Sequence, residues 1–449
     1  LAKLVQGREG EAIGAHGSIM PRASDIALCM SDARALNMGA DVGTCWCIDV
    51  YLLSMRTYND VLYASLTEGN MFTAPALDAE ELAVRAEIEA IGDRLRIHAR
   101  TGNRWTGALR RSTLARNVQG SNSIEGIFAS VDEVGAIAVG ESPSSVDEET
   151  EKALAGYQLA MTYVLQLAKG DFELDASLIR SLHFMVASYD LTKWPGRFRT
   201  GAVYVVQEST GDIAYEGARG DDVAALVATF AAGALSGADP LISAAMAHLN
   251  FVLIHPFKDG NGRMARIIQS LGLARLSESA PIFMGIEEYL GRRTQAYYDV
   301  LAKVGQGDWS TADFDPELAR PWIRFMLSAH LNQALELAQR VAAAGEAAQA
   351  VEDLAAEAAL PERTLEALYS AMFGNTVTRA RYMAALEEAG GAISEQTASR
   401  DLGALAAAGL LVAHGDKRGR RYTPSEVVKA ASRKAGLGYR WRDTDPFEK

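Results

Sequence analysis

Cysteine is scarce in this sequence, with 3 among 449 residues. Cys29, Cys45 and Cys47 all lie within the first fifty residues, and such an odd, clustered set does not suggest a disulfide framework. Cys45 and Cys47 could form half of a metal site, but no matching Cys/His pair follows, so we interpret them as structural. The cysteine usage is typical of a reducing compartment, and we expect a cytoplasmic protein.

Long apolar runs and a leader are also missing. No apolar run is long enough to cross a bilayer, and no basic segment with an apolar core and a cleavage site opens the sequence. We therefore expect neither membrane insertion nor secretion. Basic residues are outnumbered as well, with 44 Lys and Arg against 57 Asp and Glu and a net charge of -13. This balance argues against a general nucleic-acid coat, although it leaves room for a local basic element.

The length is sufficient for two or three domains, and most of the chain has helical periodicity. Residues 1–70 show no clear periodicity and stay unassigned. Helical patterns begin behind Asp78 and again behind Asp175, both of which are N-cap residue types. One exception predicts a β-hairpin, in which Val203 to Val206 pair with Ile213 to Tyr215 across a Ser-Thr-Gly-Asp turn.

The segment "HPFKDGNGRMAR", His255 to Arg266, combines residues that a packed core would not select. It follows an apolar helix, Leu241 to Ile254, and precedes a helix that we expect to begin near Arg263. A loop that ends on a helix N-terminus presents backbone amides to an anion. Gly260 and Gly262 permit positive φ and a close approach, so the amides can surround phosphate oxygens.

The charged residues of this segment complete a phosphate site. Arg263 and Arg266 lie three residues apart on one helix face, where two guanidinium groups can hold a polyphosphate. Asp259 supplies a hard oxygen ligand that suits Mg²⁺ shared with substrate phosphates. His255 stands at the other end of the loop, where a neutral imidazole can take a proton from a hydroxyl group.

The segment resembles the signature of the Fic (Fic/Doc) family, His-Pro-Phe-x-Asp/Glu-Gly-Asn-Gly-Arg-x-x-Arg, at every defined position. The resemblance extends from about Arg111 to Leu327. It implies transfer of AMP from ATP to a Ser, Thr or Tyr hydroxyl group of a target protein, with His255 as the base. It also implies that Asn261 positions the α-phosphate, that Arg263 binds phosphate oxygens and that Arg266 reaches the γ-phosphate.

The resemblance gives the hairpin a role as well. It falls where the family places its flap, an exposed edge that aligns the target segment by strand pairing, although a purely structural hairpin is the alternative. Tyr298 follows the motif and either borders the nucleotide base or packs in the core. The family signature leaves the donor open, and UTP or CDP-choline are alternatives to ATP.

"GSNSIEGIFAS" places Glu125 and Gly126 four and five residues after Ser121. By itself this could be a helix turn closed by glycine. It resembles the family's inhibitory motif, Ser/Thr-x-x-x-Glu-Gly/Asn, which implies that Glu125 pairs with Arg266 and keeps the γ-phosphate out. The same glutamate could also position a water for removal of AMP.

The C-terminal part predicts three helices followed by two short strands. The third helix, Ser394 to Ala408, presents Gln396, Thr397, Ser399 and Arg400 near its start, and the order resembles a winged helix-turn-helix. The candidate wing carries four basic residues, which are Lys417, Arg418, Arg420 and Arg421. These residues suit phosphate contacts on DNA, although winged folds also serve as protein docking modules.

The predicted fold is mainly α, a Fic helical core with a β-hairpin flap and a C-terminal winged helix-turn-helix. The predicted parts are 71–150 with the inhibitory motif, 151–330 as the catalytic core, 331–360 as an Ala-rich connecting helix, 361–425 as the winged helix and 426–449 as a tail. We expect an autoinhibited protein adenylyltransferase whose partners are ATP, Mg²⁺, a hydroxyl-bearing protein, DNA through the C-terminal module, and a second copy of the chain. The alternative is a DNA-binding regulator whose core senses a nucleotide, or an enzyme that also removes AMP.

Overall fold

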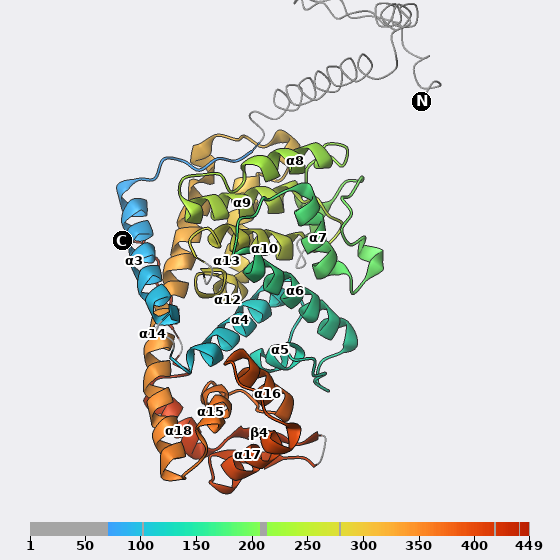
Figure 1. Ribbon diagram of the computed structural model, residues 1–449. Helices are drawn as coiled ribbons and strands as arrows, with labels where there is room; N and C mark the ends of the chain where they lie inside the picture. The colour runs from blue at the N-terminus through green and yellow to red at the C-terminus, as the bar shows by residue number, and fades with distance from the viewer. Residues whose placement is uncertain are drawn as a thin grey trace, which may run out of the picture. The chain divides into compact units, whose positions relative to one another are not determined.

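The computed structural model describes residues 71–100, 103–206, 213–277, 280–416, 419–439 and 441–448. The expectations for residues 1–70, with their three cysteines, and for Lys417 and Arg418 lie outside these ranges. The described chain is mainly helical, as predicted (Figure 1). Up to the C-terminal module its elements are α3 (Ala79–Arg100), α4 (Thr106–Ser123), α5 (Val131–Ile137), α6 (Glu148–Leu167), α7 (Ala176–Ala187), η1 (Leu191–Lys193), β1 (Tyr204–Val206), β2 (Ile213–Glu216), α8 (Val223–Gly233), α9 (Pro240–Ile254), α10 (Asn261–Leu273), α11 (Ala280–Phe283), α12 (Glu287–Arg292), α13 (Thr294–Gly305), η2 (Trp309–Thr311), η3 (Pro316–Ala319) and α14 (Arg320–Glu357).

Helices α9 and α10 pack against each other at the centre of the core (Figure 1). Helix α9 is buried on nearly every side, which its continuous apolar sequence predicts. It begins at Pro240, where the Asp239 side chain accepts hydrogen bonds from two backbone amides of the first turn. Helix α10 begins at Asn261 rather than near Arg263, because Gly260 adopts a left-handed conformation (φ 79°) and turns the loop directly into the helix.

The predicted hairpin is present. Strands β1 and β2 pair antiparallel, with Tyr204 opposite Glu216 and Val205 opposite Tyr215, while its turn lies outside the described residues. Tyr215 is buried, and its hydroxyl group donates to the Leu253 carbonyl at 2.9 Å. This bond fixes the base of the hairpin on the last turn of α9.

Helix α14 is continuous over 38 residues, so the predicted boundary at residue 330 falls inside one helix. Its first half belongs to the core, since Trp322 is fully buried and donates from Nε1 to the Ala245 carbonyl at 2.9 Å. Its second half, rich in alanine, packs against the C-terminal helices. The end of the predicted core and the predicted connecting helix therefore form one continuous helix. Within the described ranges, no helix combines the length and the apolar character that a membrane span requires.

The C-terminal module, residues 361–439, has the predicted three helices and two strands. Ser394 caps the third helix by accepting from the Thr397 amide at 3.2 Å. A further helix follows the strands, so the predicted tail begins with an ordered element. The elements of the module are η4 (Glu362–Thr364), α15 (Leu365–Met372), α16 (Arg379–Glu388), α17 (Glu395–Ala407), β3 (Leu411–His414), β4 (Arg421–Pro424) and α18 (Glu426–Lys434).

Beyond the module the chain returns to α14. The Asn332 side chain donates to the Thr444 carbonyl at 2.7 Å and accepts from the Thr444 amide at 2.9 Å. Asp443 pairs with Arg293 at 2.8 Å. The last described residues are thus docked on the core, which the prediction of a simple tail did not foresee.

Candidate active site

His255 ends α9 in the left-handed conformation (φ 54°, ψ 59°). Its Nδ1 lies 2.9 Å from the Val252 carbonyl, which can only accept, so Nδ1 carries the proton and Nε2 keeps a lone pair. Burial lowers the pKa of His255 below its ordinary 6.5. The imidazole is therefore neutral near pH 7 and can accept a proton, as a general base requires.

Arg199 holds this histidine in place, a role that the sequence did not reveal. Its buried guanidinium group donates to the His255 carbonyl at 2.6 Å and to the Ile254 carbonyl at 3.1 Å. It also donates to the Ala218 carbonyl at 2.5 Å, just beyond the hairpin. One side chain therefore connects the end of α9 to the base of the hairpin. The only sequence signal was its place in "WPGRFRTG", shortly before the predicted hairpin.

His183 of α7 packs against the loop and forms a hydrogen bond to it. Its ring stacks on the buried ring of Phe257, with centroids 3.6 Å apart and planes 3° apart. Its Nδ1 accepts from the Gly196 amide at 2.9 Å, so Nε2 donates to the Asp259 carbonyl at 2.9 Å. Burial lowers the pKa of His183 to about 4, which keeps the ring neutral in this role. The buried Phe257 ring therefore anchors the loop on the core.

Asn261 closes the loop on itself. Its side chain accepts from the Phe257 amide at 2.8 Å and donates to the Phe257 carbonyl at 2.9 Å. Both polar ends of the amide are thus used to shape the turn. A direct contact between Asn261 and a phosphate stays a prediction.

Asp259 lies half-buried at the edge of the loop. One carboxylate oxygen is 3.0 Å from the Lys193 ammonium group, and the other accepts from the Gly260 amide at 2.6 Å. Burial alone would raise the pKa of Asp259, but Lys193 and Arg263 lower it below its ordinary value. The carboxylate is therefore ionised and available to a cation. Lys193, on the short helix η1, was not predicted as a site residue.

Arg263 is 1% exposed and lies over the Tyr189 ring, with 5.6 Å from the guanidinium carbon to the ring centroid. Its Nη2 is 3.9 Å from Asp259 and 3.4 Å from the Tyr189 hydroxyl. Its Nε and Nη1 have no hydrogen-bond partner among the described residues. Buried charged donors are costly unless they are paired, so these two groups fit an anion bound at the start of α10.

Arg266 is also 1% exposed, and its partners come from the end of α4 and the turn that follows. Its Nε donates to the Ser121 hydroxyl at 2.7 Å, and its Nη2 donates to the Ser121 carbonyl at 3.0 Å and to Glu125 at 2.6 Å. Burial alone would lower the pKa of Arg266, but the Glu125 charge raises it above its ordinary value. The structure thus brings together the predicted pair.

The Glu125 carboxylate lies on the first turn of α10. A Cβ atom at Gly262 would be only 2.3 Å from its Oε1 atom, so glycine is required for this approach. The turn that carries Glu125 is closed by Gly126 (φ 76°) and is contacted by Tyr298, whose hydroxyl group donates to the Ile124 carbonyl at 3.2 Å. Tyr298 is 41% exposed, so it borders this turn rather than the core.

The predicted DNA contacts belong to the C-terminal module and form a separate surface. Gln396 and Arg400 are exposed on α17, and Arg420 and Arg421 are exposed beside the β3–β4 hairpin. The core site and this surface draw on different elements.

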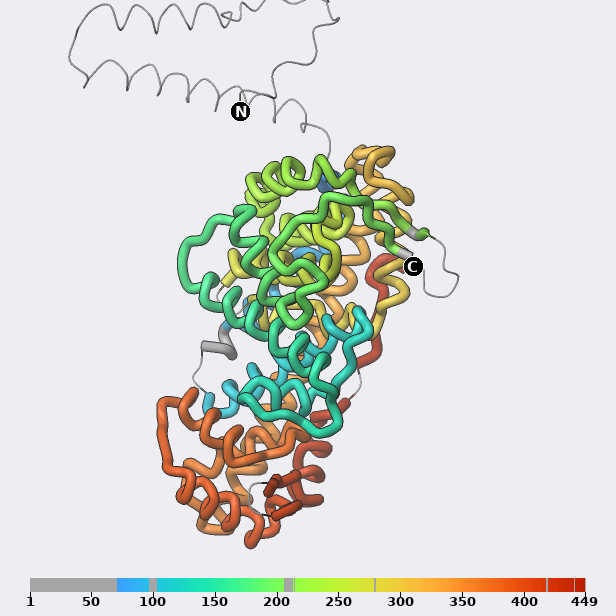
Figure 2. The backbone as a smooth tube through the Cα atoms, turned by 90° about the vertical axis from the view of Figure 1, so that its right-hand side faces the viewer, coloured from blue at the N-terminus to red at the C-terminus, as the bar shows by residue number. Residues whose placement is uncertain are grey.

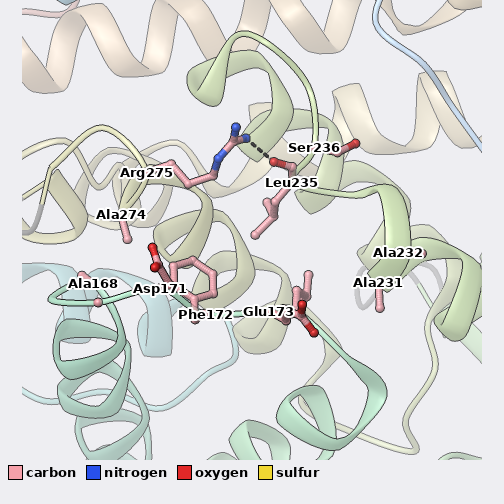
Figure 3. A pocket seen from close by; sticks show the side chains of 12 residues that line it. Ala168, Asp171, Phe172, Glu173, Ala231, Ala232, Leu235, Ser236, Ala274 and Arg275 are labelled. Carbon is pink, nitrogen blue, oxygen red and sulfur yellow. Dashed lines mark hydrogen bonds between the residues drawn. The ribbon is translucent and has the colours of Figure 1, made fainter.

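A pocket of about 690 Å³ lies where α6, α8 and α10 end (Figure 3). Asp171 and Glu173 line it together with Arg275, which donates to the carbonyls of Leu235 and Gly237. None of its lining residues is a predicted site residue, so this pocket is not part of the loop site. In the part of the chain that the structure describes, no group of three or more His, Cys, Asp or Glu side chains could hold a metal ion. A cation at Asp259 would therefore need ligands from a substrate.

Comparison with known families agrees with this geometry. A model of the Fic/DOC family matches residues 173–273, which include η1, the hairpin and the His255 to Arg266 segment. Residues 173–273 are therefore similar to the Fic/DOC domain. Because the match covers α7 to α10, the loop and its supports Arg199 and His183 all lie within the matched residues.

Similar proteins include "Protein adenylyltransferase Fic" of Drosophila willistoni, 30% identical over 185 residues, or 40% of this chain and 32% of that protein. The protein of the same name from Culex quinquefasciatus is 29% identical over 192 residues, again 40% of this chain and 32% of that protein. The chain spans about a third of the length of these relatives.

Among solved structures, a Fic family protein from Desulfovibrio desulfuricans G20 aligns with a TM-score of 0.49 at 19% identity, over 79% of this chain and 98% of that one. Fic-1 from C. elegans aligns with a TM-score of 0.42 at 22% identity, over 57% of this chain and 72% of that one.

Proposed function

We propose that the Fic domain transfers AMP from ATP to a hydroxyl side chain of a protein. The observation that carries the proposal is the pairing of a base with an anion site on one loop. His255 offers a free Nε2 lone pair, and Arg263 offers two buried donors without a partner among the described residues. Relatives named protein adenylyltransferase support the choice of AMP as the transferred group.

In this reaction the target hydroxyl oxygen attacks the α-phosphorus and its proton passes to Nε2 of His255. The new phosphorus–oxygen bond forms as the bond to the β-phosphate oxygen breaks, and pyrophosphate leaves with that electron pair. Arg263 and the amides at the start of α10 stabilise the charge that develops on the phosphate oxygens. Arg199 and His183 keep the loop in the conformation that holds the His255 base beside the phosphate site.

Asp259 is the residue that would hold Mg²⁺. A single ionised carboxylate beside a phosphate site fits the usual magnesium arrangement, in which the substrate phosphates and water supply the other ligands. When bound, the ion supplies positive charge to the leaving pyrophosphate. Lys193 lies 3.0 Å from the carboxylate and would have to share or yield it.

Glu125 would inhibit the reaction. Its carboxylate lies on Arg266 and over Gly262, where the proposed triphosphate places its own negative charge. Two anions cannot share this site without strong repulsion. ATP would therefore bind weakly or in an unproductive position until Glu125 leaves. Whether the same glutamate also supports removal of AMP is a separate outcome of the test below.

The test uses Mg²⁺ and α-labelled ATP with the wild type, Glu125→Gly, His255→Ala and the double variant. We expect Glu125→Gly to raise label on protein at least about tenfold, and His255→Ala to abolish it in both backgrounds while nucleotide binding is retained. Chelation of Mg²⁺ should also abolish labelling. Glu173→Gly, which changes an exposed glutamate in another loop, is the matched control.

Other outcomes decide between the alternatives. Label from UTP or CDP-choline but not from ATP would reassign the donor. Release of AMP from prelabelled protein that depends on Glu125 would establish the reverse activity. No label from any donor in a cell lysate, with nucleotide binding intact, would contradict transfer and favour a nucleotide sensor.

A second proposed function is DNA binding by the C-terminal module. The exposed face of α17 carries Gln396, Ser399 and Arg400 beside Gly403, and small residues allow a helix to enter the major groove. Arg420 and Arg421 on the neighbouring hairpin suit phosphates. Arg400→Ala should reduce salt-dependent binding of a DNA duplex, whereas Lys429→Ala on α18 should not. Self-association and a cytoplasmic location stay predictions.

A further inference from the structure

Helix α4 precedes Glu125 in the chain, and the surface by which it packs on the core includes buried polar groups. Its buried face combines apolar residues such as Leu109 and Val118 with polar ones, among them Ser112, Thr113, Asn117 and Asn122. Within the described structure, the Ser112 and Thr113 hydroxyl groups and the Asn117 and Asn122 side-chain carbonyls have no hydrogen-bond partner. Burial of unpaired polar atoms opposes docking and offsets part of the stabilisation that the apolar residues of α4 contribute.

The C-terminal module grips the first half of α4 through ion pairs. Arg111 lies 2.5 Å from Glu388 of α16 and 3.8 Å from Glu366 of α15. Arg110 also pairs with Glu388. Burial alone would raise the pKa of Glu388, but the two arginines lower it below its ordinary value. Figure 2 shows the backbone of α4, in cyan, beside the orange helices of the module.

The module also grips the segment that follows Glu125. Arg381 of α16 lies 2.5 Å from the Asp132 carboxylate in the first turn of α5 and 3.0 Å from Glu141, four residues beyond the end of α5. The Asp132 carboxylate accepts in addition from the Thr376 amide at 2.8 Å. The Arg381 side chain is only 14% exposed, so this cluster is less screened by solvent than a surface ion pair.

The two grips lie on either side of Glu125 in the chain. We infer that the C-terminal module clamps the inhibitory segment, residues 106–141, and thereby holds Glu125 on Arg266. Because the unpaired polar groups oppose the docking of α4 on the core, the ion pairs with the module contribute to keeping it in place. A change that separates the module from α4 and α5 then frees the phosphate site. This inference rests on the proposed function of the loop site.

The direct test is Arg381→Ala in the full chain, which removes the grip on α5 without touching the loop site. We expect AMP labelling to rise about tenfold over the wild type, a typical coupling between two sites. Hydrogen exchange of the α4 amides, residues 106–123, should become faster in the same variant. Arg379→Ala is the matched control, because Arg379 lies on the same helix but pairs with Glu395 inside the module at 3.1 Å.

A second variant, Glu388→Gln, loosens the other grip and should act in the same direction, so the result does not depend on one substitution. In the Glu125→Gly background neither variant should raise labelling further, because the inhibitory carboxylate is already gone. Unchanged exchange of α4 and unchanged labelling in both variants would overturn the clamp. If Glu125→Gly itself stays unlabelled, the proposed activity fails, and the exchange of α4 still decides whether the module holds it.

Discussion

The histidine at the centre of the site adopts a backbone conformation that few non-glycine residues adopt. His255 has φ 54°, in the left-handed region, and this conformation ends α9 and turns the chain into the loop. Arg199 stabilises it by donating to the carbonyls of Ile254 and His255. The position of His255 therefore depends on a residue that is distant in sequence, whereas its tautomer is set by the nearby Val252 carbonyl. His183 and Lys193 are also distant in sequence, and they contact the carbonyl and the carboxylate of Asp259. Arg199, His183 and Lys193 were not predicted as site residues.

The protonation state of His255 leads to a prediction for the pH dependence of AMP transfer. Burial lowers the pKa of His255 below 6.5, and the neutral form is the active base. The rate in the Glu125→Gly variant should therefore persist as the pH falls through 6.5 and decline only at lower pH. Loss of the Glu125 charge lowers this pKa further, in the same direction. Label incorporation measured from pH 5 to 8 checks this, and an acid limb above pH 6.5 would contradict it.

At the scale of elements, α4 and α12 approach closely because both contribute glycine. A Cβ atom at Gly120 would lie 2.3 Å from the Glu287 carbonyl oxygen, and one at Gly291 would lie 2.8 Å from the Gly120 backbone. This close contact fixes the distance between α4 and α12, and with it the position from which Ser121 and Glu125 contact Arg266. Helix α4 is thus positioned by its glycine contact with α12 and by the ion pair between Arg111 and Glu388 of the module.

Gly120→Ala should push α4 away from α12. We expect a loss of about 1–3 kcal/mol in unfolding free energy from overpacking, together with increased AMP labelling because Ser121 and Glu125 move off Arg266. Gly135→Ala on α5 is the control, since a Cβ there meets nothing within 4 Å and alanine favours helix. Denaturant unfolding and the labelling assay measure the two effects. Equal stability of both variants would show that α4 and α12 can separate without cost.

At the scale of the whole molecule, several neutral histidines are buried in the helical core. Burial lowers the pKa of His248 to about 3 and those of His183 and His330 to about 4. His248 lies in a buried network, with Nε2 2.8 Å from the Tyr297 hydroxyl and Nδ1 2.5 Å from Gln269, behind Arg266. The burial that keeps these histidines neutral therefore makes the free energy of unfolding depend on pH.

The sign of this dependence follows from proton uptake. The unfolded chain binds protons at these histidines as the pH falls below about 6.5, whereas the folded chain does not until about pH 4. Stability is thus complete above pH 6.5 and should fall by about 1.4 kcal/mol per pH unit for each histidine below it. Denaturant midpoints between pH 6.5 and 5 measure the slope. His330→Gln should reduce it, whereas His414→Gln, at an exposed position, should leave it unchanged.

The sequence by itself determined the elements and the chemistry of the loop. Periodicity and cap residues located α9, the hairpin and the helices of the C-terminal module, because these signals act over a few residues. The contiguous segment from His255 to Arg266 specified base, glycines and arginines together. Its resemblance to the Fic signature also pointed to Glu125 as the partner of Arg266.

The tertiary structure alone decided how these parts are held. The supports of the loop come from α7, η1 and the approach to the hairpin, and the grips on α4 and α5 come from the C-terminal module. No local pattern encodes such contacts, because each joins residues far apart in the chain whose side chains are ordinary on their own. The continuity of α14 and the docking of residues 441–448 were missed for the same reason, since packing against the core, rather than local propensity, fixes them.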